Sequence, residues 1–225
     1  MTKPRIVTES AQSAKAAPRS DARPLPVPLA GAQFETGAAK ASQLPSDGSR
    51  EIAFAGRSNA GKSSAINALA RQKRLAYASR TPGRTQLINY FRLRAGGVVA
   101  DLPGYGYAAV PRALKEDWQA FLWSYLTTRS ALVGLVLVVD ARHGLRSMDE
   151  QVLAVFVPSG RPLLVLVTKV DKLNRAQCRE AVTSITRRLR DVYPMHAGGI
   201  DVVAFSAASR AGVEEADGVI ARWIA

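Results

Sequence analysis

The sequence predicts an α/β fold with a doubly wound, mostly parallel sheet of six strands that is flanked by helices. Two observations carry this prediction. From residue 51 onward short apolar segments alternate with helical patterns, and segments such as 132–139 are apolar at almost every position. Strands that are continuously apolar are typical of a sheet buried on both faces. In such a sheet ligands bind at the carboxyl ends of the parallel strands.

The elements follow from these patterns in chain order. We expect strands at residues 51–56, 86–93, 97–101, 132–140, 162–168 and 200–205. We expect helices at residues 62–71, 112–128, 147–156, 174–190 and 211–224. The last helix places Val213, Ala216, Val219, Ile220 and Trp223 on one face, as a helix packed against a sheet requires.

The composition of the 225-residue chain fits one domain with a tail, because 47% of its residues are apolar. We expect residues 1–25 to be a disordered tail, 26–50 a partly ordered lead-in and 51–225 the functional domain. The one cysteine, Cys178, fits a reducing compartment. There is neither a signal-peptide core nor an apolar run long enough for a membrane span, so we expect a cytoplasmic protein without membrane contacts. We also expect a monomer.

The chain carries a net charge of +13, from 31 basic and 18 acidic residues. Its most basic segment, residues 71–94, contains no acid, and a second cluster consists of Arg187, Arg188 and Arg190. Such a distribution favours a polyanionic partner. A solvated surface without a partner is the alternative interpretation.

Residues 56–63 fit the pattern G-x-x-x-x-G-K-[ST] of a phosphate-binding loop. An apolar strand pattern precedes this loop and a helical pattern follows it, which is the context that the motif requires. Backbone N–H groups of such a loop and the start of its helix bind phosphate. The candidate residues are Gly56, Arg57, Ser58, Asn59, Ala60, Gly61, Lys62, Ser63 and Ser64. Lys62 would reach the terminal phosphates, and the Ser63 hydroxyl would bind Mg²⁺.

Two further motifs would sense the γ-phosphate. Asp101, Leu102, Pro103 and Gly104 follow a predicted strand; the Asp101 carboxylate would hold Mg²⁺ through water, and the Gly104 N–H would contact the γ-phosphate. A segment before the second predicted strand contains Gly83, Arg84, Thr85, Gln86 and Leu87. Thr85 in this segment would bind Mg²⁺ when a γ-phosphate is present and release it afterwards. The candidate catalytic residues are therefore Lys62, Thr85 and Gly104.

Two motifs would select the base. Thr168, Lys169, Val170 and Asp171 follow the predicted strand at 162–168. The Asp171 carboxylate would accept two hydrogen bonds from guanine, a pair of donors that adenine lacks. Phe205, Ser206 and Ala207 end the last predicted strand, where a backbone N–H would contact the guanine oxygen. The order of these five motifs indicates a GTPase. A P-loop ATPase or kinase, and a basic RNA-binding protein with a structural nucleotide, are the alternatives.

At this point the chain resembles a particular family. Gly56-Arg-Ser-Asn-Ala-Gly-Lys-Ser-Ser64, Thr81-Pro-Gly-Arg-Thr-Gln86, Asp101-Leu-Pro-Gly-Tyr-Gly-Tyr-Ala108 and Thr168-Lys-Val-Asp-Lys172 look like the EngB (YihA) family of bacterial GTPases. The resemblance covers residues 33–224. It implies a GTP-dependent switch that acts in assembly of the large ribosomal subunit and in normal cell division and septation. It also implies ribosomal RNA or the large ribosomal subunit as the polyanionic partner.

Two positions depart from the Ras-type pattern, and a third residue, Asn59, suggests a compensating device. Tyr105 follows Asp-x-x-Gly where Ras-like proteins have a water-orienting glutamine, so we expect slow intrinsic hydrolysis. Thr168 replaces an asparagine, as it does in EngB relatives, and its hydroxyl can form only part of that amide's bonds. Asn59 either coordinates a K⁺ ion that stimulates hydrolysis, as in related GTPases with asparagine here, or stabilises the turn.

The basic segment 71–94 overlaps the switch that would sense the γ-phosphate. We therefore expect GTP to order Thr85 and Arg84 and to expose the neighbouring arginines to ribosomal RNA. Tyr105 and Tyr107 would either stack on a base or a partner, or pack beneath the switch.

Overall fold

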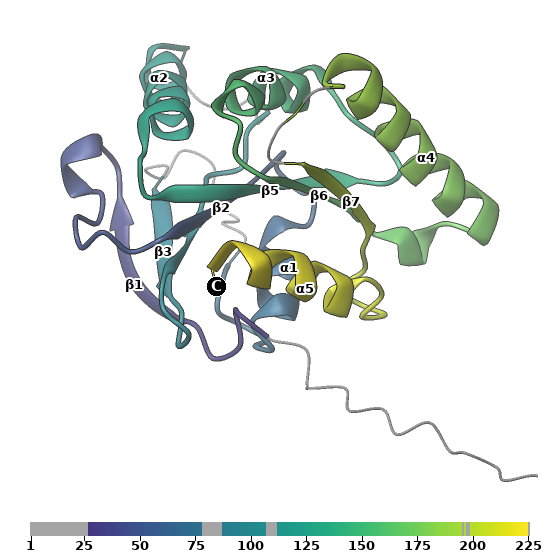
Figure 1. Ribbon diagram of the computed structural model, residues 1–225, viewed down its shortest axis with the longest axis horizontal. Helices are drawn as coiled ribbons and strands as arrows, with labels where there is room; N and C mark the ends of the chain where they lie inside the picture. Colours follow the sequence, from purple (N-terminus) through teal and green to yellow (C-terminus); the bar gives the residue numbers. More distant parts are fainter. Residues whose placement is uncertain (1–26, 78–86, 107–111, 195, 197–198, 225) are drawn as a thin grey trace, which may run out of the picture.

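The computed structural model describes residues 27–77, 87–106, 112–194, 196 and 199–224, with the side chains of 112–118 left out (Figure 1). A seven-stranded sheet forms the middle layer, with strand order β1-β3-β4-β2-β5-β6-β7. The strands are β1 (Gln33–Ala38), β2 (Glu51–Gly56), β3 (Ile88–Arg92), β4 (Val98–Asp101), β5 (Leu132–Asp140), β6 (Leu163–Thr168) and β7 (Ile200–Ala204). β2 pairs in parallel with β4 and β5, and β5, β6 and β7 continue the parallel part. Only β3 runs in the opposite direction, because it pairs antiparallel with both β1 and β4.

Helices cover both faces of this sheet, as Figure 1 shows. The α-helices are α1 (Lys62–Leu69), α2 (Arg112–Thr128), α3 (Ser147–Phe156), α4 (Arg175–Val192) and α5 (Val213–Ile224). The described residues also form three short 3-10 helices, at Ala41–Gln43, Val157–Ser159 and Val170–Lys172. No helix in the described part of the chain is both long and apolar enough to cross a membrane.

The predicted α/β fold with a mostly parallel sheet is confirmed, and each predicted element is present within about two residues of its expected bounds. The sheet has seven strands rather than the expected six. The additional strand, β1, lies in the lead-in at 26–50, so this part of the lead-in belongs to the sheet. β1 lacks an apolar signature because it is an edge strand: its first three residues are exposed, and its sequence, Gln-Phe-Glu-Thr-Gly-Ala, contains a glycine.

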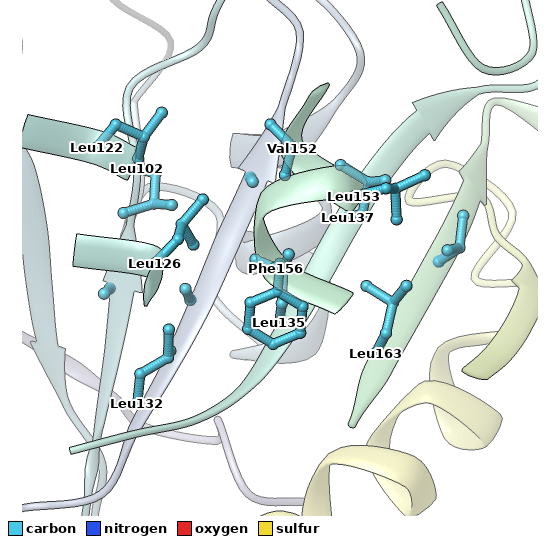
Figure 2. Close-up of a cluster of buried hydrophobic side chains, with 14 of the residues drawn as sticks. Leu102, Leu122, Leu126, Leu132, Leu135, Leu137, Val152, Leu153, Phe156 and Leu163 are labelled. Carbon is cyan, nitrogen blue, oxygen red and sulfur yellow. The ribbon is translucent and has the colours of Figure 1, made fainter. Parts of the chain in front are cut away.

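The core consists of two apolar layers that the sheet separates. Alternate residues of β5 supply both, since Leu135 and Leu137 pack against α2, α3 and α4, whereas Val136 and Val138 pack against α1 and α5. Figure 2 shows the first layer, in which Phe156 of α3 lies over Leu135. This two-sided burial explains the continuously apolar strands of the sequence.

Helix α5 approaches β5 so closely that only glycine fits at one position. A Cβ atom added at Gly134 would lie 2.4 Å from the ring of Trp223. Trp223 is itself buried on the inner face of α5. The glycine therefore sets the distance between this helix and the sheet.

An ionic cluster joins the C-terminal end of α1 to α5. The Arg71 guanidinium donates to the Asp217 carboxylate at 2.6 Å and to the Ala68 carbonyl oxygen at 3.0 Å. Arg210 donates to the same carbonyl at 3.2 Å. Asp217 is almost fully buried, and this burial raises its pKa to about 6 although Arg71 and Arg210 oppose the shift.

We predict that Gly134→Ala lowers the free energy of unfolding by about 1–3 kcal/mol, because the new methyl group overlaps the Trp223 ring. Gly218→Ala is the matched control: Gly218 lies in α5 with open space around its Cβ position, so alanine is expected to raise stability by up to about 1 kcal/mol. Denaturant titration measures both. Equal stabilities of the two variants would contradict the close packing of α5.

We predict that Asp217 makes stability depend on pH. The folded state binds the Asp217 proton more tightly than the unfolded state, whose pKa is near 3.8, so the stability from this group falls as pH rises from 4 through 6 and is constant above. Asp217→Asn lacks this dependence. The unfolding free energy of the native chain minus that of the variant is expected to fall by about 2 kcal/mol between pH 4 and pH 7. A difference that does not change with pH would show that Asp217 has an ordinary pKa.

Candidate functional site

The loop after β2 has the backbone of an anion-binding site. Asn59 and Gly61 both adopt left-handed conformations, with φ of 64° and 102°. α1 begins at Lys62 directly after this turn, and no side chain caps its first amides. These N–H groups and the helix dipole favour an anion at the start of α1. A Cβ atom at Gly56 would lie 2.7 Å from the Val138 carbonyl oxygen, so the loop also needs glycine where it leaves the sheet.

The Asp101–Gly104 motif lies against this loop. The Lys62 ammonium contacts the carboxylate of Asp101, which is buried at the end of β4. The backbone of Gly104 passes so close to Ser58 that a Cβ atom would lie 3.1 Å from the Ser58 hydroxyl and 3.2 Å from its Cα. The Ser58 N–H donates to the Tyr105 carbonyl oxygen at 2.9 Å. The two predicted phosphate-contacting segments are therefore fastened together.

The Thr168–Asp171 motif contacts the phosphate loop from the other side. The Thr168 hydroxyl lies 2.5 Å from the Ala60 carbonyl oxygen and 3.1 Å from that of Val139. The Lys169 ammonium donates to the Asn59 carbonyl oxygen at 2.6 Å. Thr168 thus provides the link to the phosphate loop, although it has only a hydroxyl at the position of the usual asparagine.

Asp171 is held by the loop that follows β7. The Ser206 hydroxyl donates to the Asp171 carboxylate at 2.6 Å, and this bond lowers the Asp171 pKa. The side chain is consequently ionised at neutral pH and can accept hydrogen bonds. The Phe205 carbonyl oxygen accepts the Val170 N–H at 3.4 Å, and the Ser206 N–H already donates to Ala211 at 3.0 Å. Ala207 is therefore the better candidate for the predicted backbone contact to a base.

Asp140 is a residue of this site to which the sequence pattern assigned no chemistry. Its carboxylate lies 2.9 Å from the Lys169 ammonium and 2.7 Å from Arg142 at the end of β5. Burial raises its pKa, but these two cations outweigh the burial, so the pKa lies well below its ordinary value. A charged Asp140 fixes Lys169 beside the loop. A single acid at the end of an otherwise apolar strand was the signal that could have identified it.

Not every predicted residue is part of the site that the structure describes. Gly83, Arg84, Thr85 and Gln86 are outside the described residues, as is Tyr107. The side chain of Leu87 lies against Gly37 of β1, at the edge of the sheet. Of the two interpretations of Tyr105, the structure supports packing, because this side chain is buried and donates to Asp149 at 2.6 Å.

The residues near the start of α1 fit a magnesium ion. The Ser63 hydroxyl is half-buried in the first helical turn, and Asp101 adds a carboxylate. Both offer oxygen, which Mg²⁺ prefers, and the ion commonly keeps several waters. For Asn59 the structure supports stabilisation of the turn, since asparagine tolerates the left-handed conformation found at this position. Potassium binding stays a prediction.

Comparison with known proteins agrees with this geometry. Residues 51–169 match the family model described as "50S ribosome-binding GTPase", and residues 119–224 match that of the "Elongation factor Tu GTP binding domain". The chain is 51% identical over 193 residues to a probable GTP-binding protein EngB of Azoarcus sp. (strain BH72), covering 86% of this chain and 91% of the relative. A relative of the same name from Stenotrophomonas maltophilia (strain K279a) is 47% identical over 193 residues, covering 86% and 95%.

Solved structures show the same fold. A crystal structure of a probable GTP-binding protein engB superimposes with a TM-score of 0.63 at 22% identity, covering 77% of this chain and 98% of that one. The matching family models and the phosphate loop define a P-loop GTPase, so the protein binds GTP and hydrolyses it. The identity to the curated relatives is more specific: this chain belongs to the EngB family of GTP-binding proteins.

Proposed function

We propose that residues 51–225 bind Mg²⁺ and GTP between the loops described above, and that slow hydrolysis to GDP and phosphate makes the protein a molecular switch. The lead-in completes the sheet through β1. One observation carries this proposal. The phosphate loop contacts both the motif at 101–104 and the motif at 168–171, and Asp171 of the latter contacts the motif at 205–207. One pocket at the carboxyl ends of the strands is the expected result.

Each predicted residue has a distinct task in this pocket. The loop amides and Lys62 bind the phosphates, and the Gly104 N–H contacts the γ-phosphate. The hydroxyls of Ser63 and Thr85 would hold Mg²⁺, with Asp101 acting through water. When bound, the ion neutralises charge on the β- and γ-phosphate oxygens. Asp171 reads guanine while Lys169 covers the base.

Slow intrinsic hydrolysis is supported by the position of Tyr105. Its hydroxyl donates to Asp149 and its side chain is only 5% exposed, so it does not point toward a water at the γ-phosphate. Within residues 101–106 of this loop there is no glutamine to orient such a water. A stimulating partner would therefore set the lifetime of the GTP state.

We predict that Asp171→Asn weakens GTP binding at least tenfold and shifts preference toward xanthosine triphosphate, because the amide presents a donor where guanine also presents donors. Titration of the native chain and the variant with guanosine, xanthosine and adenosine triphosphates in magnesium buffer measures this. ATP competing with GTP for the native chain would favour an ATPase or kinase instead. If folded native protein binds neither GTP nor GDP, the proposed function is wrong.

For the cellular role, we propose assembly of the large ribosomal subunit in the cytoplasm, with a consequent requirement in cell division and septation. The printed name of the matching family, "50S ribosome-binding GTPase", and the net charge of +13 support this role. We further propose that the protein acts as a monomer. The alternative, an RNA-binding protein with a purely structural nucleotide, predicts that Lys62→Ala leaves RNA binding unchanged.

Not all arginines of the basic segment are available to an RNA partner. Within the basic segment 71–94, Arg71 is paired with Asp217, and Arg92 is paired with Glu35 and Asp47. These two cations therefore act within the fold. Arg80 and Arg84 lie outside the described residues.

Helix α4 offers a more continuous basic surface. Ile185 and Leu189 bury its inner side, whereas four arginines are exposed along about 22 Å of its length. These four, which we call the α4 arginines, are Arg175, Arg179, Arg187 and Arg190. In the described part of the structure none of them forms an ion pair. We therefore propose that the α4 arginines contact RNA phosphates, although Glu180 and Asp191 lie on the same helix.

We predict that Arg179→Glu/Arg187→Glu weakens co-sedimentation with large ribosomal subunits at least tenfold and reduces its salt dependence, because two phosphate contacts are lost. Lys73→Glu/Arg74→Glu changes the charge equally on exposed residues of the segment 71–94. Both variants should bind GTP like the native chain. If only the Lys73/Arg74 variant weakens binding, the basic segment is the RNA surface and the α4 assignment is wrong. If both variants weaken it equally, net charge alone is responsible.

A further inference from the structure

Tyr105 connects the γ-phosphate motif to two different parts of the fold. Its backbone lies beside the phosphate loop, with the N–H donating to the Gly56 carbonyl oxygen at 3.3 Å and the carbonyl oxygen accepting from Ser58 at 2.9 Å. Its side chain extends to α3, where the hydroxyl donates to an Asp149 carboxylate oxygen at 2.6 Å. Both the backbone and the side chain of the residue after Gly104 are thus held by hydrogen bonds.

The carboxylate that receives this bond is itself fully engaged. Asp149 is buried in the first turn of α3, and its second oxygen accepts the Arg146 N–H at 2.9 Å. Burial raises the pKa of Asp149, while the bonds from Tyr105 and Arg146 and the nearby charges of Arg57 and Arg146 oppose this rise. Burial also raises the pKa of Tyr105 well above its ordinary value, so the phenol stays protonated and its O–H group donates the hydrogen bond.

The contact is more specific than the packing of an aromatic ring. A phenylalanine would fill the same space, but it would leave one buried carboxylate oxygen without its donor. Arg57 of the phosphate loop also lies next to this segment, since a Cβ atom at Gly106 would be 3.5 Å from its guanidinium. The segment 104–106 is therefore confined between the phosphate loop and α3.

We infer that Tyr105 and Asp149 are positioning residues for GTP hydrolysis, whose hydrogen bond holds the Gly104 N–H in place for the γ-phosphate. This inference rests on the proposed nucleotide pocket. The γ-phosphate distinguishes GTP from GDP, so loss of the bond affects binding of a non-hydrolysable GTP analogue and turnover but leaves GDP binding unchanged. A hydrogen bond that merely stabilised the fold would have the same effect on both nucleotides.

The structure contains a matched control for this chemistry. Tyr125 is also buried and donates its hydroxyl to a buried carboxylate, that of Glu51, at 2.8 Å. Glu51 begins β2, whereas the phosphate loop follows the other end of this strand, about 17 Å away. Tyr125→Phe therefore removes an equivalent bond far from the pocket.

The experiment compares Tyr105→Phe, Asp149→Leu, the double variant and Tyr125→Phe. Each is measured for thermal stability, affinity for GDP and for the GTP analogue, and single-turnover hydrolysis. We expect Tyr105→Phe and Asp149→Leu each to slow hydrolysis about tenfold and to weaken the analogue several-fold at unchanged GDP affinity. The double variant should be no slower than the slower single variant, because both substitutions remove one bond. Tyr125→Phe should lower stability but leave hydrolysis and the GTP-to-GDP preference unchanged.

Three results would overturn this inference. One is native hydrolysis by folded Tyr105→Phe, and another is single effects that multiply in the double variant. The third is equal weakening of GDP and analogue in Tyr105→Phe, which indicates a structural role only. If Asp149→Leu fails to fold, Asp149→Asn replaces it. The asparagine amide can still donate to the Tyr105 oxygen, so we expect a smaller loss of turnover than in Tyr105→Phe. Failure of the native chain to bind GDP would instead refute the proposed function.

Discussion

The hydrogen bond between the Thr168 hydroxyl and the Ala60 carbonyl oxygen joins two loops on which the rest of the site depends. One loop is shaped to receive phosphates and the other carries the acid that would select guanine. Lys169 adds a second connection, because its ammonium bridges the Asn59 carbonyl oxygen and the Asp140 carboxylate. A nucleotide spanning both loops would thus meet two loops that are already joined, and less of its binding energy would be lost in ordering them.

The parallel sheet explains why polar groups can be buried here. Asp101, Asp140 and Thr168 end three apolar strands at the same edge, and each contacts a residue of a neighbouring loop. The opposite edge has its own buried acid, Glu51, which is satisfied by Tyr125 and Arg129. Buried charge is therefore paired at both the carboxyl and the amino ends of the strands, as its desolvation requires. Only the carboxyl-end edge combines this charge with a glycine-rich turn and a helix start.

Much of the fold could be predicted because its causes are local. The apolar runs of β5 and β6 and the glycines at 56 and 61 leave a clear pattern in the chain. β1 leaves little pattern, since an edge strand with exposed residues needs no apolar alternation. Tertiary contacts were also hidden: nothing local to Tyr105 indicates Asp149, which is 44 residues away. The pairing of Arg71 with Asp217 was equally invisible, so the basic segment seemed more available than it is.

The outer edge of β1 has a consequence for how the protein behaves when concentrated. Among the described residues β1 is the last strand on its side of the sheet, so its outward backbone groups could pair with a strand from another molecule. Phe34, which is 60% exposed at this edge, adds an apolar side chain that favours association. Two features oppose such growth: Glu35 carries a charge, and the register of β1 shifts between Phe34 and Thr36. An irregular, charged strand is a poor template for edge-to-edge pairing, which offsets the exposed aromatic side chain.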